Sequence, residues 1–304
     1  MIEIKRILCP VDFSEFSRHA LEHGLVLARW YGAEVTVLHA FPVPAAPVIA
    51  GYPEPMPLPT MQGSPQELTR QAEASLKRFV ETLDASALTL HLKAEAGDGV
   101  QQILAAAETL PADLIVLGTH GRSGVDRLVL GSVAERVLRK SACPVLTVPP
   151  PVSRAADATL VFQRILCPID FSEPSMRALT YALSLAQEAD ASLLLMHVVE
   201  ALPLVSSDLY PHFDVVGYQQ ALMDSARERL RSSVPDEARV WCRPEEIVTT
   251  GKAYPEILRA ARERQADLVV MGVHGRNPID LMLFGSTTQH IVRQARCPVL
   301  TLRS

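Results

Sequence analysis

The stretch GTHGRSGVDRLVLGS at residues 118–132 returns later in the chain as GVHGRNPIDLMLFGS at residues 272–286. Three glycines and a serine hold the same places in both copies, and each copy follows an apolar run, DLIVLG or DLVVMG. A strand that is buried on both faces of a parallel sheet has such a nearly continuous apolar run. The pattern therefore predicts, twice, a buried strand that ends in a glycine turn and leads into a helix.

The repeat extends over nearly the whole chain of 304 residues. KRILCPVDFSEFSRHAL at residues 5–21 matches QRILCPIDFSEPSMRAL at residues 163–179. A period of about 150 residues indicates duplicated domains, because solenoid repeats are only about 20–50 residues long. A proline run follows the last strand of the first copy. We therefore predict one domain at residues 1–149, a linker at 150–161 and a second domain at 162–304.

Strand and helix patterns alternate within each half. In the first half we expect strands at 6–12, 33–41, about 87–95, 113–118 and 144–148. Helices are expected there at 14–28, about 65–83, about 99–109 and 132–140. Apolar strands separated by helices predict a doubly wound α/β unit, an open parallel sheet with helices on both faces, twice in tandem. Aromatic residues make up only 5% of the chain, so its cores should be mostly aliphatic.

The charge balance argues against nucleic acid and membranes as partners. The formal net charge is −5 without a dense run of Lys or Arg, so no electrostatic footprint for nucleic acid or an anionic membrane is present. The chain has no apolar run of about 18 residues, the length of a membrane-spanning helix. Charged residues come too early at the N-terminus for a signal peptide. We expect a cytoplasmic protein.

The cysteines have no spacing typical of a metal site. Four of the five form two equivalent pairs at strand ends, and we expect small buried apolar residues at these positions. The five are Cys9, Cys143, Cys167, Cys242 and Cys297.

The positions that are identical in both copies, which we call the glycine frame, fit a binding site for an anion. Its first-half members are Gly118, Gly121, Gly131 and Ser132. Glycine at a turn lets another molecule approach the backbone, and a helix N-terminus presents free N–H groups to phosphate oxygens. Ser132 to Glu135 and Ser286 to Gln289 fit a capping box, which predicts that each serine caps a helix. Alternatively, the glycines serve only the turn and the helix start.

Side chains beside the frame can add to a binding site. His120 and Arg122, like His274 and Arg276, follow the strand end and could donate hydrogen bonds to a phosphate. Asp12 and Asp170 come just after the first strand of each half. A carboxylate repels phosphate, so we expect each aspartate to accept hydrogen bonds from a ribose or a base. Ligands of open parallel sheets bind at this carboxyl edge.

These motifs resemble the adenosine-nucleotide-binding branch of the universal stress protein family. The resemblance rests on G-x-x-G, nine residues and G-[ST], after a first-strand aspartate in PVDFSE or PIDFSE. It covers both halves and leaves out the linker and a proline-rich segment at residues 41–65. The resemblance implies a five-stranded parallel sheet of order 3-2-1-4-5 in each half, with ATP, with or without Mg²⁺, between the first and fourth strands.

The resemblance also implies which residues would hold the nucleotide. Asp12 and the backbone at Ala40 would meet the base and ribose. Gly118, Gly121, Gly131, Ser132 and Val133 would hold the ribose and phosphates. The matching residues of the second half are Asp170, Val198, Gly272, Gly275, Gly285, Ser286 and Thr287. A further implication is that domains pair through their last strands, within this tandem chain or also between two chains as a homodimer.

The two copies differ between their glycines. Arg127 is matched by Leu281, and Ser123-Gly124 by Asn277-Pro278. The second copy therefore lacks a cation and has a stiffer loop. We predict that the first half binds ATP more tightly than the second.

Three function hypotheses remain open from the sequence. The leading one is an ATP-binding regulatory protein of the stress response with little or no catalysis, because the chain has neither a G-x-x-x-x-G-K-[ST] loop nor a G-x-S-x-G elbow. His39, His197, His120 and His274, all at strand ends, are expected mainly to position structure or ligand. A slow ATPase is the second hypothesis, and a binding module for a lipid or other hydrophobic molecule is the third. Residues 41–65 form either a solvated connection or a lid or partner surface.

Overall fold

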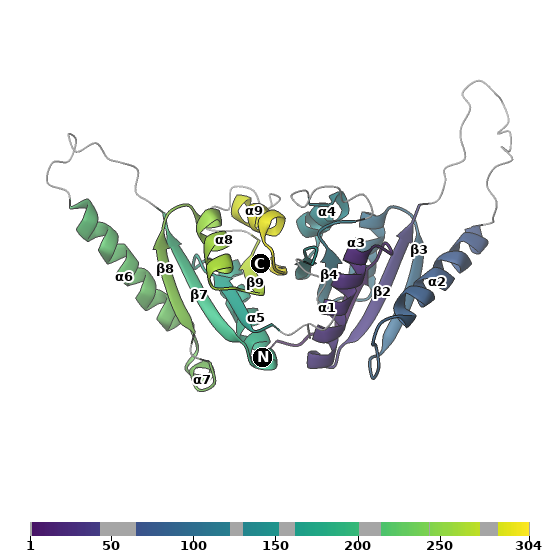
Figure 1. Cartoon of the computed structure of the whole chain (residues 1–304), viewed down its shortest axis with the longest axis horizontal. Helices are drawn as coiled ribbons and strands as arrows, with labels where there is room; N and C mark the ends of the chain where they lie inside the picture. Colours follow the sequence, from purple (N-terminus) through teal and green to yellow (C-terminus); the bar gives the residue numbers. More distant parts are fainter. Residues whose placement is uncertain are drawn as a thin grey trace, which may run out of the picture.

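A computed structural model describes residues 2–42, 65–121, 130–151, 162–200, 214–242, 244–273 and 285–303. These residues form one ten-stranded sheet of order β3-β2-β1-β4-β5-β10-β9-β6-β7-β8. Helices cover both of its faces, and the two halves of the chain lie side by side (Figure 1). Most of the proline-rich segment and of the predicted linker lies outside the described residues.

The elements follow the predicted alternation closely. The first-half strands are β1 (Arg6–Pro10), β2 (Glu34–Phe41), β3 (Leu90–Ala96), β4 (Leu114–Gly118) and β5 (Val145–Val148), and its helices are α1 (Glu15–Tyr31), α2 (Pro65–Glu81), α3 (Gly99–Thr109) and α4 (Ser132–Lys140). The second-half strands are β6 (Arg164–Pro168), β7 (Ser192–Val199), β8 (Glu245–Thr250), β9 (Leu268–Gly272) and β10 (Val299–Leu302). Its helices are α5 (Glu173–Ala189), α6 (Val215–Ser233), α7 (Asp236–Arg239), α8 (Ala253–Glu263) and α9 (Ser286–Gln294).

Each half has the predicted strand order. Within a half all neighbouring strands are parallel, and β1 lies between β2 and β4, as β6 lies between β7 and β9. The order 3-2-1-4-5 and the doubly wound α/β class are confirmed. The carboxyl ends of β1 and β4 therefore meet at one edge of the sheet, where the winding reverses.

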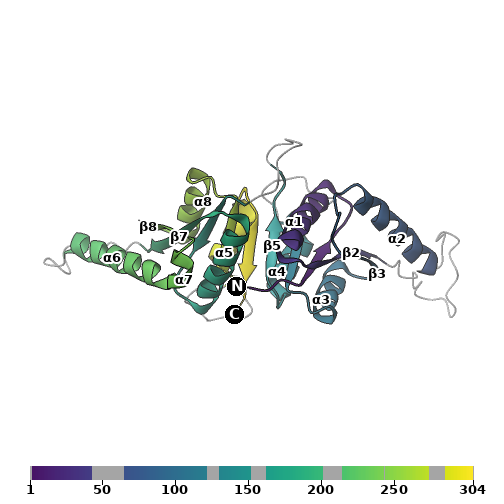
Figure 2. The same cartoon turned by 90° about the horizontal axis from the view of Figure 1, so that it is seen from below.

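The two five-stranded sheets join where β10 pairs antiparallel with β5. We call this junction, together with α4 and α9 beside it, the seam. Figure 2 shows β5 and the yellow C-terminal strand at the centre of the molecule, with α2 and α6 at its far ends. The joined sheet buries the two strands that would be edges in isolated halves.

A mostly aliphatic core lies on each face of the sheet and runs across the seam. One core includes Leu21 of α1, Leu76 of α2 and Leu179 of α5, and the other includes Val137 of α4 and Ile291 of α9. All five cysteines are free, and all but the half-buried Cys143 are buried. Among the four paired cysteines, the prediction of a buried residue is confirmed for Cys9, Cys167 and Cys297.

Candidate functional site

A tight turn holds Asp12 at the carboxyl end of β1. Its Oδ1 accepts hydrogen bonds from the backbone N–H of Ser14 at 3.0 Å and from the Ser14 hydroxyl at 2.5 Å. Ser14 is also the N-cap of α1 and accepts from the N–H of Ser17. Phe13 between them has a φ of 66°, a left-handed conformation that non-glycine residues rarely adopt. The turn thus fixes one carboxylate oxygen of Asp12.

The second half repeats this turn. Asp170 Oδ1 accepts from the N–H of Ser172 at 3.0 Å and from its hydroxyl at 2.5 Å, and Phe171 has a φ of 65°. A strained backbone that recurs at equivalent positions is held by its surroundings, and such strain often accompanies functional sites.

The histidine of the neighbouring strand supports each turn. His39 Nδ1 lies 2.8 Å from the Val11 carbonyl, and His197 Nδ1 lies 2.7 Å from the Ile169 carbonyl. Because a carbonyl oxygen only accepts, the imidazole Nδ1 must carry the proton in both cases. His39 also packs against the Phe13 ring, with centroids 4.1 Å apart. These contacts give both histidines a role in positioning the aspartate turn.

The other carboxylate oxygen of Asp12 faces the glycine frame. A Cβ placed on Gly121 would lie 2.9 Å from Asp12 Oδ2. A Cβ on Gly118, at the end of β4, would lie 3.1 Å from the Phe16 carbonyl oxygen. The structure therefore brings Asp12 and the first-half glycines together, as expected from strands that meet at one edge, and it leaves little room for side chains there.

The last glycine of each frame directly precedes a helix. Gly131 is the N-cap of α4, and its N–H donates to the Thr119 carbonyl at 2.8 Å. A Cβ on Gly131 would lie 3.2 Å from Thr119 O, and one on Gly285, the N-cap of α9, would lie 2.6 Å from Val273 O. A side chain is therefore excluded at Gly285 and crowded at Gly131, because the backbone turns directly against the strand end.

The predicted capping box is wrong. Ser132 and Ser286 are the first residues of their helices, not the caps, and neither N-cap glycine has a side chain to bond the helix. The reason is that the hydrogen bond to the strand end makes the glycine the last non-helical residue. Among the described residues no side chain caps α4 or α9, and the first N–H groups of a helix can bind an anion.

The remaining predicted residues are placed as follows. Val133 and Thr287 follow the two serines in the first turns of α4 and α9. Ala40 lies in β2 opposite Glu95, and Val198 lies in β7 opposite Thr249. His120 Nδ1 lies 2.9 Å from the Thr119 hydroxyl.

A Cβ on Gly272, the last residue of β9, would lie 2.8 Å from Pro174 Cβ. Arg122, His274, Gly275 and Arg276 lie outside the described residues, as do Arg127, Leu281 and the pairs Ser123-Gly124 and Asn277-Pro278.

Sequence reasoning missed the residues that hold the site together. Ser14 and Ser172 fix the aspartates, and a D-x-S spacing before a helix is a usable signal for such a turn. Thr288 bonds the Gly272 and Val273 carbonyls at 3.0 and 3.2 Å in the second half only. The equivalent residue of the first half is Ala134, which has no hydroxyl, so comparing the two copies does not point to the Thr288 hydrogen bonds.

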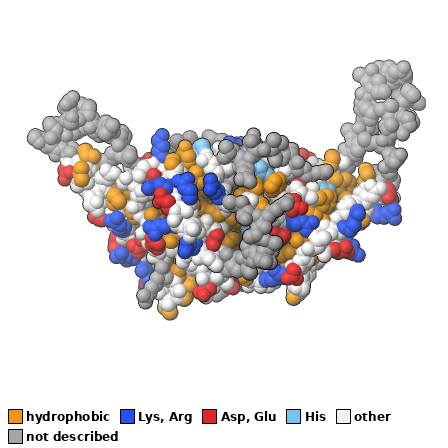
Figure 3. Space-filling view, viewed as in Figure 1, with side chains coloured by type: hydrophobic (Ala, Val, Ile, Leu, Met, Phe, Trp, Pro, Cys, Tyr) orange, Lys and Arg blue, Asp and Glu red, His pale blue; other side chains and the backbone are white. Residues whose placement is uncertain are grey.

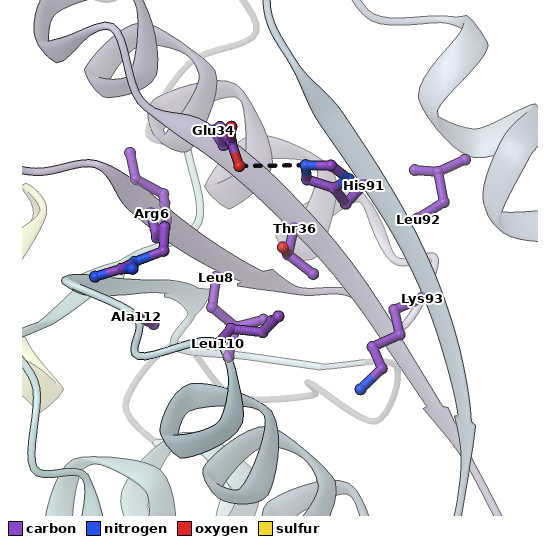
Figure 4. A pocket seen from close by; sticks show the side chains of 10 residues that line it. Arg6, Leu8, Glu34, Thr36, His91, Leu92, Lys93, Leu110 and Ala112 are labelled. Carbon is purple, nitrogen blue, oxygen red and sulfur yellow. Dashed lines mark hydrogen bonds and ion pairs between the residues drawn. The ribbon is translucent and has the colours of Figure 1, made fainter.

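A separate cavity of about 270 Å³ lies at the amino ends of β1, β2 and β3, away from the aspartate turn. Figure 4 shows its lining, in which charged side chains surround a mainly apolar surface and His91 contacts Glu34 at 3.3 Å. Lys93 pairs with Glu95 at 3.1 Å, and Arg6 lies 3.6 Å from Asp113. Because these charges already have protein partners, we do not assign the cavity a ligand.

Acidic and basic side chains are interspersed over the described part of the face in Figure 3. Along the described ranges, no helix is long and apolar enough to cross a membrane.

The fold and the repeated site define a tandem pair of doubly wound α/β units, each with an aspartate turn beside a glycine-started helix. The model of the universal stress protein family matches residues 3–149 and 162–303. The chain therefore belongs to the universal stress protein family and contains two copies of its domain.

Individual relatives agree with this assignment. A universal stress protein of Methanocaldococcus jannaschii is 33% identical over 151 residues, which cover 48% of this chain and 83% of the relative. One from Mycobacterium tuberculosis is 27% identical over 308 residues, which cover 94% of this chain and 99% of the relative. The crystal structure of a universal stress protein from Archaeoglobus fulgidus covers 99% of both chains with a TM-score of 0.71 and 23% identity. This last likeness shows the shared fold.

Proposed function

We propose that this protein binds ATP at the carboxyl edge of each half and acts as a regulatory protein of the stress response with little or no catalysis. The observation that carries the proposal is the approach of Asp12 Oδ2 to Gly121, beside the glycine-started helix α4. A hydrogen-bond acceptor for a ribose or base thus lies near a site for phosphate oxygens. This polarity matches a nucleoside phosphate.

The local geometry fits the phosphate groups. A side chain on Gly131 or Gly285 would meet the preceding backbone carbonyl, so glycine lets the chain pass directly from the strand end into the helix. The two helix N-termini supply N–H groups and the positive end of the helix dipole. The sequence has no lysine placed by a P-loop motif against the terminal phosphates, which favours binding over rapid hydrolysis.

Pairing of the halves belongs to the same proposal. The β5–β10 ladder uses the strands that the family resemblance implies for domain pairing. We propose that the two halves stay joined in solution through this ladder, so that one chain forms the unit that binds nucleotide.

Two serine substitutions test nucleotide binding. Ser132 and Ser286 are exposed first residues of helices, so glutamate there adds charge at the phosphate position without a backbone clash and favours the helix dipole. We expect Ser132→Glu to remove ATP binding from the first half and Ser286→Glu to remove it from the second, as measured by isothermal titration calorimetry. Ser192→Glu is the control, since Ser192 starts β7 and the first half already carries Glu34 at the equivalent position.

The small molecules carried by the purified protein give an independent readout. Native mass spectrometry should find an adenine nucleotide, whereas a lipid mass would support the hydrophobic-ligand alternative. Phosphate release in multiple turnovers above that of the Ser132→Glu/Ser286→Glu protein would support a slow ATPase. If the wild-type protein carries no nucleotide and gives no heat with ATP, the proposed function is wrong.

A further inference from the structure

An ion pair crosses the seam between the two halves. Arg293 Nη2 lies 3.2 Å from Glu135 Oε2, and both side chains are partly buried. Glu135 is in the first turn of α4, whereas Arg293 is in the last turn of α9. The N-terminus of α4, where we place phosphate groups, therefore lies beside the C-terminal turn of the helix from the other half.

Glu135 has opposite effects on the helix and on a ligand. A carboxylate in the first turn favours the helix dipole, but the same negative charge repels a phosphate bound at that N-terminus. The guanidinium of Arg293 offsets this charge. The Nε of Arg293 is buried and has no hydrogen-bond partner among the described residues, whereas its Nη2 donates to Glu135 Oε2.

The second half lacks this arrangement. The residue equivalent to Glu135 is Gln289, and the residue equivalent to Arg293 is Arg139. A neutral glutamine in the first turn of α9 does not repel phosphate and needs no compensating cation. The guanidinium of Arg139 is exposed, and its backbone carbonyl accepts a hydrogen bond from Arg303.

We propose that Arg293, a residue of the second half, is a positioning residue for the nucleotide site of the first half, where it offsets the charge of Glu135. This inference rests on the proposed function. It makes the first-half site dependent on the seam, whereas the second-half site is independent of the equivalent contact.

A double-mutant cycle tests the inference in the full-length chain. Wild type, Arg293→Gln, Glu135→Gln and the double variant are compared in a Ser286→Glu background, so that only the first-half site reports. The probe is ATP, titrated by calorimetry at about 0.01 M and about 0.15 M ionic strength, where the Debye length is roughly 30 Å and 8 Å. The matched control is Arg139→Gln in a Ser132→Glu background, which reports the second-half site.

We expect Arg293→Gln to weaken ATP binding about two- to five-fold at low salt, the effect of one charge near a helix terminus, and less at high salt. In the Glu135→Gln background the same substitution should cost less affinity, because Arg293 then has no carboxylate to hold it beside the N-terminus of α4. Arg139→Gln should leave the second site unchanged. Arg293→Lys, which keeps the charge, should bind ATP like wild type. It takes the place of Arg293→Gln in the comparison if that variant folds poorly.

The outcomes separate this inference from the proposed function. Absence of ATP binding in the wild type overturns the proposed function and with it this inference. Normal ATP binding with an unchanged Arg293→Gln affinity at low salt overturns the inference alone. If Arg293→Gln loses the same ATP affinity with Glu135 and with Gln at position 135, the inference is also overturned, because Arg293 would then not act through Glu135.

Discussion

Thr147 of β5 donates a hydrogen bond to β10, and Thr301 of β10 donates one to β5. Thr147 Oγ1 lies 3.1 Å from the Val299 carbonyl oxygen, and Thr301 Oγ1 lies 3.2 Å from that of Val145. Both threonines are buried. Because they occupy equivalent positions of the repeat, the two bonds are related by a local two-fold axis through the seam.

Removal of either hydroxyl should weaken the seam. We expect Thr147→Val and Thr301→Val to lower the free energy of unfolding by about 0.5–1.5 kcal/mol each, since valine keeps the shape but loses one hydrogen bond. Urea denaturation measures the change. Thr180→Val, at an exposed helix position, is the control. Losses no larger than the control's would show that these bonds do not contribute.

Gly24 of α1 should tolerate no side chain. A Cβ there would lie 2.5 Å from Cys9 Sγ, so Gly24→Ala should destabilise the fold by about 1–3 kcal/mol, a typical cost of overpacking. Cys9→Ala should relieve most of that cost in a double variant. Gly99→Ala, where a Cβ would meet nothing within 4 Å, is the control in thermal melts. Equal melting temperatures for Gly24→Ala and Gly99→Ala would contradict the prediction.

His23 makes stability depend on pH. Its side chain is buried in α1, 6.1 Å from the Phe162 ring, and burial lowers the pKa of His23 to about 4. The charge of nearby His19 contributes to this lowering of the pKa, whereas the hydrogen bond to the His19 carbonyl and the charge of Glu22 oppose it. The unfolded chain, with an ordinary histidine pKa of about 6.5, binds more protons between those two values.

The stability contributed by neutral His23 should therefore be fully present above about pH 6.5 and be lost as pH falls toward 4. Urea denaturation between these pH values measures the slope. His23→Gln should be less stable at neutral pH but should flatten the dependence in this window. An unchanged slope in this variant would assign the acid sensitivity to other groups.

The two nucleotide sites should differ in affinity. The Ser286→Glu protein retains the first-half site, and the Ser132→Glu protein retains the second. We expect the first to bind ATP more tightly, because Arg127 is replaced by Leu281 and a Ser-Gly pair by Asn-Pro in the second copy. Calorimetry on the two proteins measures the ratio. Equal affinities would contradict the asymmetry.

Local elements were predictable because each has its own sequence signal. The expected end of α1 at residue 28 was early, because the helix continues to Tyr31 and is closed by Gly32, which has a φ of 63°. The expected start of β3 at about residue 87 was early, since Ala87 has a φ of 64° and lies in a turn that delays the strand to Leu90. No glycine marks that turn in the sequence.

Contacts between the halves were less predictable. The Glu135–Arg293 pair joins residues 158 positions apart, and neither periodicity nor motif links them. The capping-box motif even assigned Glu135 to a different contact. The aspartate and glycine positions were found because a repeat exposes them, whereas their support by Ser14 and His39 depends on how the strand ends turn.

Because both halves belong to one chain, the two sides of the seam can carry different residues at equivalent positions. In a symmetric homodimer of single domains, each substitution at a two-fold interface appears on both sides, so a Glu–Arg pair formed once would be formed twice. In this chain the positions 135 and 289 are encoded separately, and only one holds a glutamate. Two copies in one chain can therefore differ at the seam, so that one half specialises as a partner for the other while the shared interface is kept.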